Sequence, residues 1–261
     1  MAVFIIGDFN VVDYSIVSEN LSINTECFIL DSTPSTNDFL SALPISDKSQ
    51  ICVAREQTNG KGQYDRQWLS KKDSSVLTSL RINYGIDTSL NGLSLVVGIA
   101  IIDVLIDDYG VDKLKLKWPN DVYFDNKKLA GILIENSVQN KSQSVIIGIG
   151  LNNNLDDSFS CETPWTDLSR ILEFTPKIET LTVNIINKVI KYSNQFEQDG
   201  LSAFKSKWAE FDYLLNKKLE LNYNGSKMIG TAKGINHQGA LIIETKGVLI
   251  EAFSSEQIKL I

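Results

Sequence analysis

The stretch from Lys113 to Glu135 constrains the fold more than any other part of the chain. Apolar residues and lysines alternate through Lys113–Trp118. Alternation with a period of two predicts a β-strand with one apolar face and one lysine face. A proline cannot donate to a strand ladder, so the strand is expected to end at Pro119-Asn120-Asp121.

The same stretch predicts a hairpin after this strand. Val122-Tyr123-Phe124 is apolar enough for a second short strand, and Asp125-Asn126 is a favourable two-residue turn because both residue types tolerate positive φ. The chain then returns through Lys128–Ile134 as a third strand.

Lys128 is the residue of this hairpin that calls for a chemical explanation. By strand parity it is expected on the same face as Ala130 and Ile132. The small side chains of Ala130 and Gly131 leave room beside the strand, and an ammonium group there suits a bound carboxylate or phosphate. The alternative is a solvated lysine at a hairpin end, as most lysines are.

Length and composition bound the class of protein. A chain of 261 residues with 43% hydrophobic residues allows one large domain and a small one. The net charge of -7 and the lack of a Lys/Arg-rich run argue against a general nucleic-acid binder. Three cysteines without metal-ligand spacing indicate reduced thiols, and we found no signal peptide or membrane-length apolar run. We therefore expect a soluble cytoplasmic protein.

The histidine content excludes most chemistry that needs a histidine base or several histidine ligands. The single histidine, His237, lies in the turn sequence Asn236–Gly239.

Three further segments carry polar side chains or glycines in patterns that suit a ligand. In Asp31–Asp38, Thr33 or Ser35 is expected to cap a short helix, leaving other hydroxyls and Asn37 for a polar headgroup. In Val145–Asn154, alternate glycines indicate close approach by a ligand or by another backbone, and Asn152 offers the donor and acceptor that a purine edge needs. A strand bulge with an Asn-rich turn is the alternative for the last segment.

The third segment is Arg55–Trp68, which contains two glycines, Lys61 and Arg66. It is neither a Walker loop nor a dinucleotide fingerprint, because the Gly-Lys-Ser/Thr ending and the third glycine are missing. Such a loop still suits closure over phosphates, and Trp68 offers a flat face to a base, worth ~1–3 kcal/mol of stacking. A mobile surface loop with a core tryptophan is the alternative.

The remaining pattern predicts a larger helical and stranded part followed by a small β-barrel. Strands are expected at Val3–Ile6, Cys27–Leu30, Ile51–Ala54 and Ser75–Leu80, and helices at Asn91–Tyr109, Ile178–Glu197 and Leu201–Phe211. Short strands then follow at Leu219–Tyr223, Met228–Ile235, Ala240–Glu244, Val248–Phe253 and Gln257–Ile261. We predict a catalytic domain over 1–213 and a C-terminal domain over 214–261.

Taken in order, the motifs resemble those of biotin protein ligases. The series is Ser35-Thr36-Asn37, Gln57-Thr58-Asn59-Gly60-Lys61-Gly62 with Trp68, Lys117-Trp118-Pro119-Asn120-Asp121, Lys128-Leu129-Ala130-Gly131-Ile132-Leu133, and Gly148 with Gly150 and Asn152. The resemblance implies an α+β fold, with a mixed sheet flanked by helices and a small C-terminal SH3-like barrel.

The resemblance also implies a two-step reaction. Biotin and ATP with Mg²⁺ would form biotinyl-5′-AMP, and biotin would pass to one lysine of the biotin carboxyl carrier protein of acetyl-CoA carboxylase. The family allows a homodimer.

The resemblance assigns roles to individual residues. Those expected to bind biotin are Ser35, Thr36, Asn37, Gln57, Gly60, Lys61, Gly62, Lys128, Gly131 and Leu133. Those expected to bind the nucleotide are Lys61, Gln63, Arg66, Trp68, Lys117, Asn120 and Asn152. The catalytic residues would be Lys128, Arg66, Lys117 and Asp121, with Asp121 also a ligand of Mg²⁺.

The chain departs from the family pattern in two places. Gln63-Tyr64-Asp65 replace the arginine-rich loop of many members, so we expect weaker retention of the adenylate. Only 34 residues precede Ser35, fewer than the roughly 60 of a helix-turn-helix module, so we expect no DNA binding.

Three alternative functions remain open at this point. A lipoate ligase has a related fold and also makes an acyl-adenylate, although the Lys117–Asp121 and Gln57–Gly62 motifs favour biotin. The others are a non-catalytic biotin sensor on the same scaffold, against which Lys128 argues, and a DNA-binding repressor.

Overall fold

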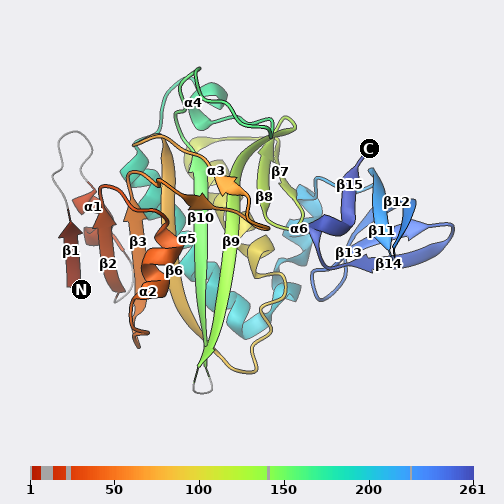
Figure 1. The fold of residues 1–261 in the computed structure, drawn as a ribbon, viewed down its shortest axis with the longest axis horizontal. Helices are drawn as coiled ribbons and strands as arrows, with labels where there is room; N and C mark the ends of the chain where they lie inside the picture. The colour runs from red at the N-terminus through yellow and green to blue at the C-terminus, as the bar shows by residue number, and fades with distance from the viewer. Residues whose placement is uncertain (1, 7–13, 22–24, 140–141, 224) are drawn as a thin grey trace.

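The computed structural model describes residues 2–6, 14–21, 25–139, 142–223 and 225–261. Its main element is an eight-stranded sheet, which Figure 1 shows running across the larger part of the molecule. The strands in spatial order are β1 (Ala2–Ile6), β2 (Thr25–Leu30), β3 (Ser49–Ala54), β6 (Ser75–Gly85), β10 (Ser142–Asn152), β9 (Lys127–Gln139), β8 (Asp121–Phe124) and β7 (Leu114–Lys117). β1 to β3 are parallel and the other pairs antiparallel, so the sheet is mixed.

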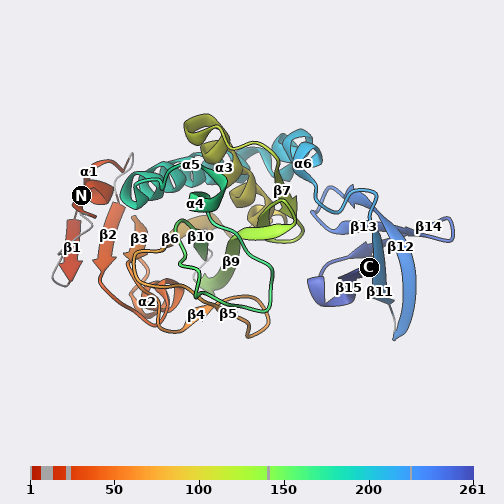
Figure 2. The ribbon, with the colours of Figure 1, turned by 90° about the horizontal axis from the view of Figure 1, so that it is seen from above.

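Each face of the sheet buries its own set of side chains. Along β3, Ile51 and Val53 belong to a large core, whereas Cys52 and Ala54 belong to a small one. The helices α3 (Leu93–Tyr109) and α5 (Ile178–Asp199) cover the first face, and α2 (Thr36–Ala42) lies on the other, as Figure 2 shows. The remaining elements of this part are the short helices α1 (Ser15–Glu19) and α4 (Leu168–Ile171) and the hairpin of β4 (Gly60–Lys61) and β5 (Gln67–Trp68).

Helix α3 shows how the sequence fixes an element of this core. Its side chains are buried around most of the circumference, as expected for a helix packed between a sheet and other helices. It begins after Gly92 and ends at Gly110, and both glycines adopt the left-handed backbone that terminates helices. The predicted helix and its predicted stop are therefore confirmed.

The small core beneath α2 leaves much of its face free for a site. It consists of Phe28, Leu30, Leu40, Cys52, Ala54 and Ile146, with Phe39 and Leu43 packed against it. Beyond this cluster the same face is lined by glycines and polar side chains of β6, β9 and β10.

A separate antiparallel sheet forms the C-terminal part, as predicted. Its strand order is β14 (Val248–Ala252), β13 (Leu241–Thr245), β12 (Ser226–Ile235), β11 (Lys218–Tyr223) and β15 (Ile258–Leu260), with η2 (Ser255–Gln257) between β14 and β15. The chain reaches it through η1 (Leu201–Phe204) and α6 (Lys205–Phe211). The α+β fold class with a small C-terminal β-structure is therefore confirmed.

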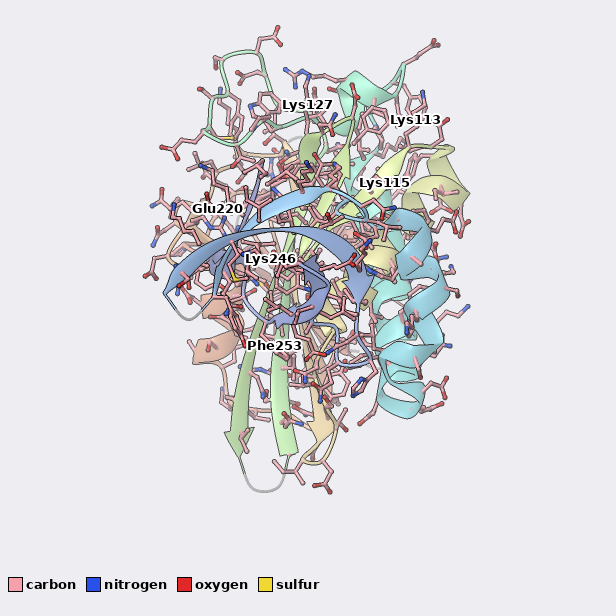
Figure 3. The ribbon with its side chains drawn as sticks, turned by 90° about the vertical axis from the view of Figure 1, so that its right-hand side faces the viewer. Lys113, Lys115, Lys127, Glu220, Lys246 and Phe253 are labelled. Carbon is pink, nitrogen blue, oxygen red and sulfur yellow. The ribbon has the colours of Figure 1, made fainter. Side chains whose placement is uncertain are left out.

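Hydrogen bonds link β7 and the residues after it to the C-terminal part and to the segment that leads into it. The indole Nε1 of Trp118 donates to the carbonyl of Gly239 at 2.9 Å, and Tyr213 N donates to the carbonyl of Leu116 at 2.9 Å. Figure 3 looks onto the C-terminal sheet, with Phe253 at its lower edge and lysines of the larger part above it. The C-terminal part thus sits against the end of β7, at the turn that contains Pro119.

Two further expectations concern membranes and thiols. Among the described residues, every helix is too short or too polar to cross a membrane. All three cysteines are free, with Cys27 and Cys52 buried and Cys161 partly exposed. Burial raises the pKa of the Cys27 thiol to about 12 and that of Cys52 well above its ordinary value.

Thiol labelling tests this burial. Because the thiolate is the reactive form, Cys161 is expected to react with a disulfide reagent in the native protein, and Cys27 and Cys52 only after unfolding. The number of thiols titrated per chain before and after denaturation measures this. Cys161→Ser should remove the native reaction; rapid native labelling of that variant would contradict the buried positions.

Candidate active site

Most of the residues singled out from the sequence line one cavity on the α2 face of the sheet. The cavity has a volume of about 110 Å³. The predicted residues that line it are Ser35, Thr36, Asn37, Gln57, Lys61, Gly62, Gln63, Arg66, Trp68, Asn120, Asp121, Lys128, Gly131 and Leu133. The first turn of α2, the β4–β5 hairpin, the β8–β9 hairpin and β10 therefore meet at this point.

The first turn of α2 presents hydroxyl and amide groups to the cavity. Ser35 caps the helix, because its Oγ accepts from Asp38 N at 3.3 Å. Gln57 Oε1 accepts from Thr36 N at 2.8 Å and from Thr36 Oγ1 at 3.1 Å. Gln57 is thereby fixed against the helix, and its side chain lines the cavity.

Two residues that the sequence analysis missed complete this polar group. Ser79 Oγ lies 2.7 Å from Thr36 Oγ1 and donates to Asn37 Oδ1 at 2.6 Å, and Asn37 Nδ2 donates to Glu135 Oε2 at 2.6 Å. A serine in the middle of the apolar strand β6 was the available signal, since a buried hydroxyl needs a partner. The network fixes both the position and the amide orientation of Asn37.

The glycines of β10 allow side chains to lie directly on the sheet. A Cβ at Gly148 would collide with the amide of Asn37, and one at Gly150 would collide with the indole of Trp68. The close approach expected from the alternate glycines is therefore present, and it is made by the protein's own side chains.

Lys128 lies on the opposite face from the one predicted by strand parity. Tyr123 pairs with Lys128 and Val122 pairs with Ala130, so Leu129 is an extra residue in β9. This β-bulge shifts the alternation by one position. Ala130 and Ile132 enter the large core, whereas Lys128 extends over Gly131 into the cavity. The predicted parity was wrong, because a bulge leaves no clear signal in an apolar strand.

The ammonium group of Lys128 is held between a carboxylate and an aromatic ring. Its Nζ lies 2.7 Å from Asp121 Oδ1 and 5.5 Å from the centroid of the Trp68 ring. The backbone of Lys128 is also fixed, since its N donates to Pro164 O at 2.8 Å and its O accepts from Thr166 N at 3.0 Å. The lysine is thus preorganised at the centre of the cavity.

The β4–β5 hairpin covers this centre. Lys61 Nζ pairs with Asp38 Oδ1 at 2.6 Å, Gly62 N donates to Arg66 O at 2.7 Å, and Trp68 lies over the sheet. Sites for small molecules usually measure ~300–1,000 Å³. The cavity is smaller than this range, and it adjoins a larger groove of about 550 Å³.

Three predicted site residues lie outside the cavity wall. Lys117 lines an adjoining groove, which shares Arg66, Asn120 and Asp121 with the cavity. Asn152 is buried, and its Nδ2 donates to Thr166 O at 3.0 Å. Gly60 lies behind the hairpin, where a Cβ would be 2.5 Å from Trp68 O. Gly60 is therefore required for the pairing of β4 with β5.

Burial and nearby charges affect Lys117. Burial lowers the pKa of its ammonium group, and Asp121 opposes this shift while Lys128 and Arg66 add to it. Its Nζ lies 3.2 Å from the hydroxyl oxygen of Tyr123. Cationic groups from three segments thus converge where the cavity meets the groove.

Comparison with known proteins agrees with this site. A model of the Biotin/lipoate A/B protein ligase family matches residues 29–152, which include all the cavity residues except Thr163. The fold and the cavity therefore define a domain of the biotin and lipoate ligase class.

Individual relatives narrow the class. The chain is 31% identical over 228 residues to the bifunctional ligase/repressor BirA of Escherichia coli, covering 85% of this chain and 70% of that protein. It is 28% identical over 222 residues to the biotin–[acetyl-CoA-carboxylase] ligase of Paracoccus denitrificans, covering 82% and 92%. The structure of the biotin protein ligase of Aquifex aeolicus in complex with biotin and ATP superposes with a TM-score of 0.77 at 26% identity, covering 90% and 97%. The chain belongs to the biotin protein ligase family.

Filling the space above Gly148 is expected to disrupt the polar group. In Gly148→Ala the new methyl group displaces Asn37, and overpacking of this kind costs ~1–3 kcal/mol of stability. Urea unfolding measures the loss. Gly85→Ala on the neighbouring strand is the matched control, since the contact of its Cβ within the described part of the chain is with Thr88 Oγ1 at 3.4 Å, an ordinary van der Waals distance. Equal stabilities of the two variants would contradict the close packing of Asn37.

Proposed function

We propose that this chain is a biotin protein ligase, which forms biotinyl-5′-AMP from biotin and ATP and transfers the biotinyl group to a lysine of a carrier protein. The observation that carries the proposal is the position of Lys128. Its side chain lines the same cavity as the amide and hydroxyl groups of α2 and the cationic hairpin, and its ammonium group pairs with Asp121. The carboxylate of biotin and the α-phosphate of ATP would meet there.

The biotin headgroup would bind at the first turn of α2. Its ureido ring has two N–H donors and one carbonyl acceptor, and the side chains of Ser35, Thr36, Asn37 and Gln57 offer both kinds of partner. Gly131 and Leu133 of β9 would contact the rest of the molecule, with Lys61 and Gly62 over it. The fixed network around Asn37 supports this assignment, because it removes the cost of orienting these groups on binding.

The nucleotide would bind beneath the β4–β5 hairpin. Two buried polar atoms there, Trp68 Nε1 and Gln63 Oε1, have no hydrogen-bond partner within the described residues, which is unusual unless a ligand or water supplies one. Adenine would stack on Trp68, and Asn152 would support the adenine end from beneath the 164–166 segment. Asn120, whose Nδ2 donates to Ile132 O at 2.7 Å, would hold the β7–β8 turn against β9 beside it.

The first chemical step would be attack of a biotin carboxylate oxygen on the α-phosphorus of ATP, with pyrophosphate as the leaving group. This step needs no strong base; it needs positioning and positive charge where negative charge develops. Lys128 would bridge the carboxylate and the α-phosphate, and Arg66, Lys61 and Lys117 would face the phosphates. In the second step the acceptor amine would attack the acyl carbon and release AMP, with Asp121 beside it.

Asp121 would also be the protein's ligand for Mg²⁺. No group of three or more His, Cys, Asp or Glu side chains gathers in the described part of the chain. A single carboxylate suits Mg²⁺, which usually takes one or two carboxylates and completes its shell with phosphates and water. The ion would then neutralise phosphate charge.

The proposed acceptor is the biotin carboxyl carrier protein of acetyl-CoA carboxylase, on the basis of the name of the Paracoccus relative, and the proposed location is the cytoplasm. We also propose that the C-terminal domain begins at Leu214, three residues after the end of α6.

Pyrophosphate–ATP exchange tests the proposed function. With Mg²⁺ present, biotin is expected to support exchange, whereas lipoate and no acid are not. If lipoate supports exchange and biotin does not, the chain is a lipoate ligase and the assigned substrate is wrong. No exchange by a folded protein that binds biotin would reject the ligase.

Removal of the central ammonium group should abolish most of the rate. Lys128→Ala is expected to lower the exchange rate by ~10²–10³, as loss of one preorganised oxyanion donor does. The matched control is Lys127→Ala, the exposed neighbour on the same strand, which should retain activity. A rate for Lys128→Ala within threefold of wild type would contradict the role of Lys128.

The pH dependence should report on Lys117. Because burial lowers the pKa of this lysine, its charge is lost at a lower pH than that of a surface lysine, and activity should fall with it. Arginine stays protonated, so Lys117→Arg should move the alkaline limb of kcat/KM for ATP to higher pH. Lys115→Arg, on the same strand, should leave the limb in place. Coincident limbs for wild type and Lys117→Arg would exclude Lys117 as the titrating group.

A further inference from the structure

The tip of the β4–β5 hairpin touches the C-terminal sheet. The hydroxyl oxygen of Tyr64 lies 2.7 Å from Ser254 Oγ, a contact between residues 190 positions apart in the sequence. Ser254 follows the end of β14 and caps η2, where its Oγ accepts from Glu256 N at 3.2 Å. Its neighbour Phe253 marks this place in Figure 3. The hairpin over the active-site cavity is therefore tied to the small sheet.

The backbone at the tip is one that tyrosine adopts rarely. Tyr64 and Asp65 have φ values of 56° and 57°, and Arg66 N donates to Gln63 O across them at 3.3 Å. Such left-handed pairs form tight hairpin turns and favour glycine, asparagine and aspartate. A tyrosine persists there only when its surroundings hold it, and such outliers gather at ligand clamps. The contacts that hold Tyr64 are the one with Ser254 and the guanidinium of Arg66, 5.7 Å from its ring centroid.

Tyr64 stands between two openings that separate the sheets. A groove of about 550 Å³ and a smaller one of about 210 Å³ are both lined by Tyr64 and by residues of the C-terminal part. The larger groove shares Arg66, Asn120 and Asp121 with the active-site cavity. A displacement of Tyr64 would therefore move Arg66 at the wall of the active site.

We propose that Tyr64 is a positioning residue for the adenylation reaction, which holds the hairpin closed over the nucleotide by its contact with Ser254. The proposal rests on the proposed function for the identity of the ligand. The Gln63-Tyr64-Asp65 segment lacks the arginines of the arginine-rich loop described above. In this proposal the contact between Tyr64 and Ser254, called the tie below, holds the hairpin in their place. The C-terminal sheet thereby becomes part of the nucleotide site, although none of its described residues lines the cavity.

Tyr64→Phe tests the tie, because it removes only the hydroxyl group and keeps the ring beside Arg66. The KM for ATP and the rate of adenylate escape are expected to rise about 2- to 12-fold, as for the loss of one hydrogen bond. The KM for biotin should rise less than that for ATP, since the headgroup residues lie on α2 and at Gln57 and only Lys61 and Gly62 of the hairpin lie over biotin. This difference between the two substrates would not follow from a general loss of folding.

Matched variants separate the contact from the substitution itself. Tyr223→Phe, an exposed tyrosine of β11, should behave as wild type. Ser254→Thr keeps a hydroxyl and should retain the wild-type KM for ATP, whereas Ser254→Ala should reproduce the effect of Tyr64→Phe. In the Ser254→Ala background Tyr64→Phe should add nothing, because both changes remove the same contact.

Amide hydrogen exchange on the ligand-free chain separates failure of this proposal from failure of the proposed function. Gly62–Arg66 should exchange faster in Tyr64→Phe than in wild type, whether or not the protein makes an adenylate. Unchanged amide hydrogen exchange at these residues would contradict the proposed role of Tyr64. Equal rises in the KM for biotin and the KM for ATP would also contradict it. If the wild-type protein shows no biotin-dependent pyrophosphate–ATP exchange, the proposed ligase function is rejected. Amide hydrogen exchange then still decides whether the contact between Tyr64 and Ser254 holds the hairpin.

Discussion

Lys128 owes its position in the cavity to one extra residue in a strand. Without the bulge at Leu129, Lys128 would point with Ala130 and Ile132 into the large apolar core, where an unpaired charge is costly. With the bulge it lies over Gly131, which is the residue opposite Asp121 in the ladder, and its ammonium group forms an ion pair with Asp121. The position of Lys128, its pairing with Asp121 and its place in the cavity thus all depend on this one β-bulge.

The sequence was sufficient for the elements and for most members of the site. Alternation and turn residues predicted the β7–β8–β9 meander, and Asp125 and Asn126 do adopt the expected positive φ. The ordered motifs identified the segments that meet at the cavity, because each carries polar or glycine residues that a plain core strand would not need. Local sequence signals of this kind are enough to predict the position of a side chain when that position depends only on its own strand or turn.

The parts that could not be predicted depend on contacts between distant segments. Ser79 and Glu135 orient Asn37 only because β6 and β9 lie on either side of β10 and below α2. Lys117 lines the groove between the sheets because the C-terminal part packs against its strand. No spacing in the sequence encodes these distances, so the network and the groove appear only once the chain is folded.

The lysines of the first meander have a consequence for the approach of ligands. Lys113, Lys115 and Lys127 lie together above the C-terminal sheet in Figure 3, on a chain whose net charge is -7. Lysines gathered at one end of an acidic molecule would make that end less repulsive to anions than the rest of the surface. At low ionic strength the association rate constant of an anionic ligand should therefore exceed the value set by diffusion alone into an opening of this size. The same field gives an acidic macromolecule a preferred side from which to arrive.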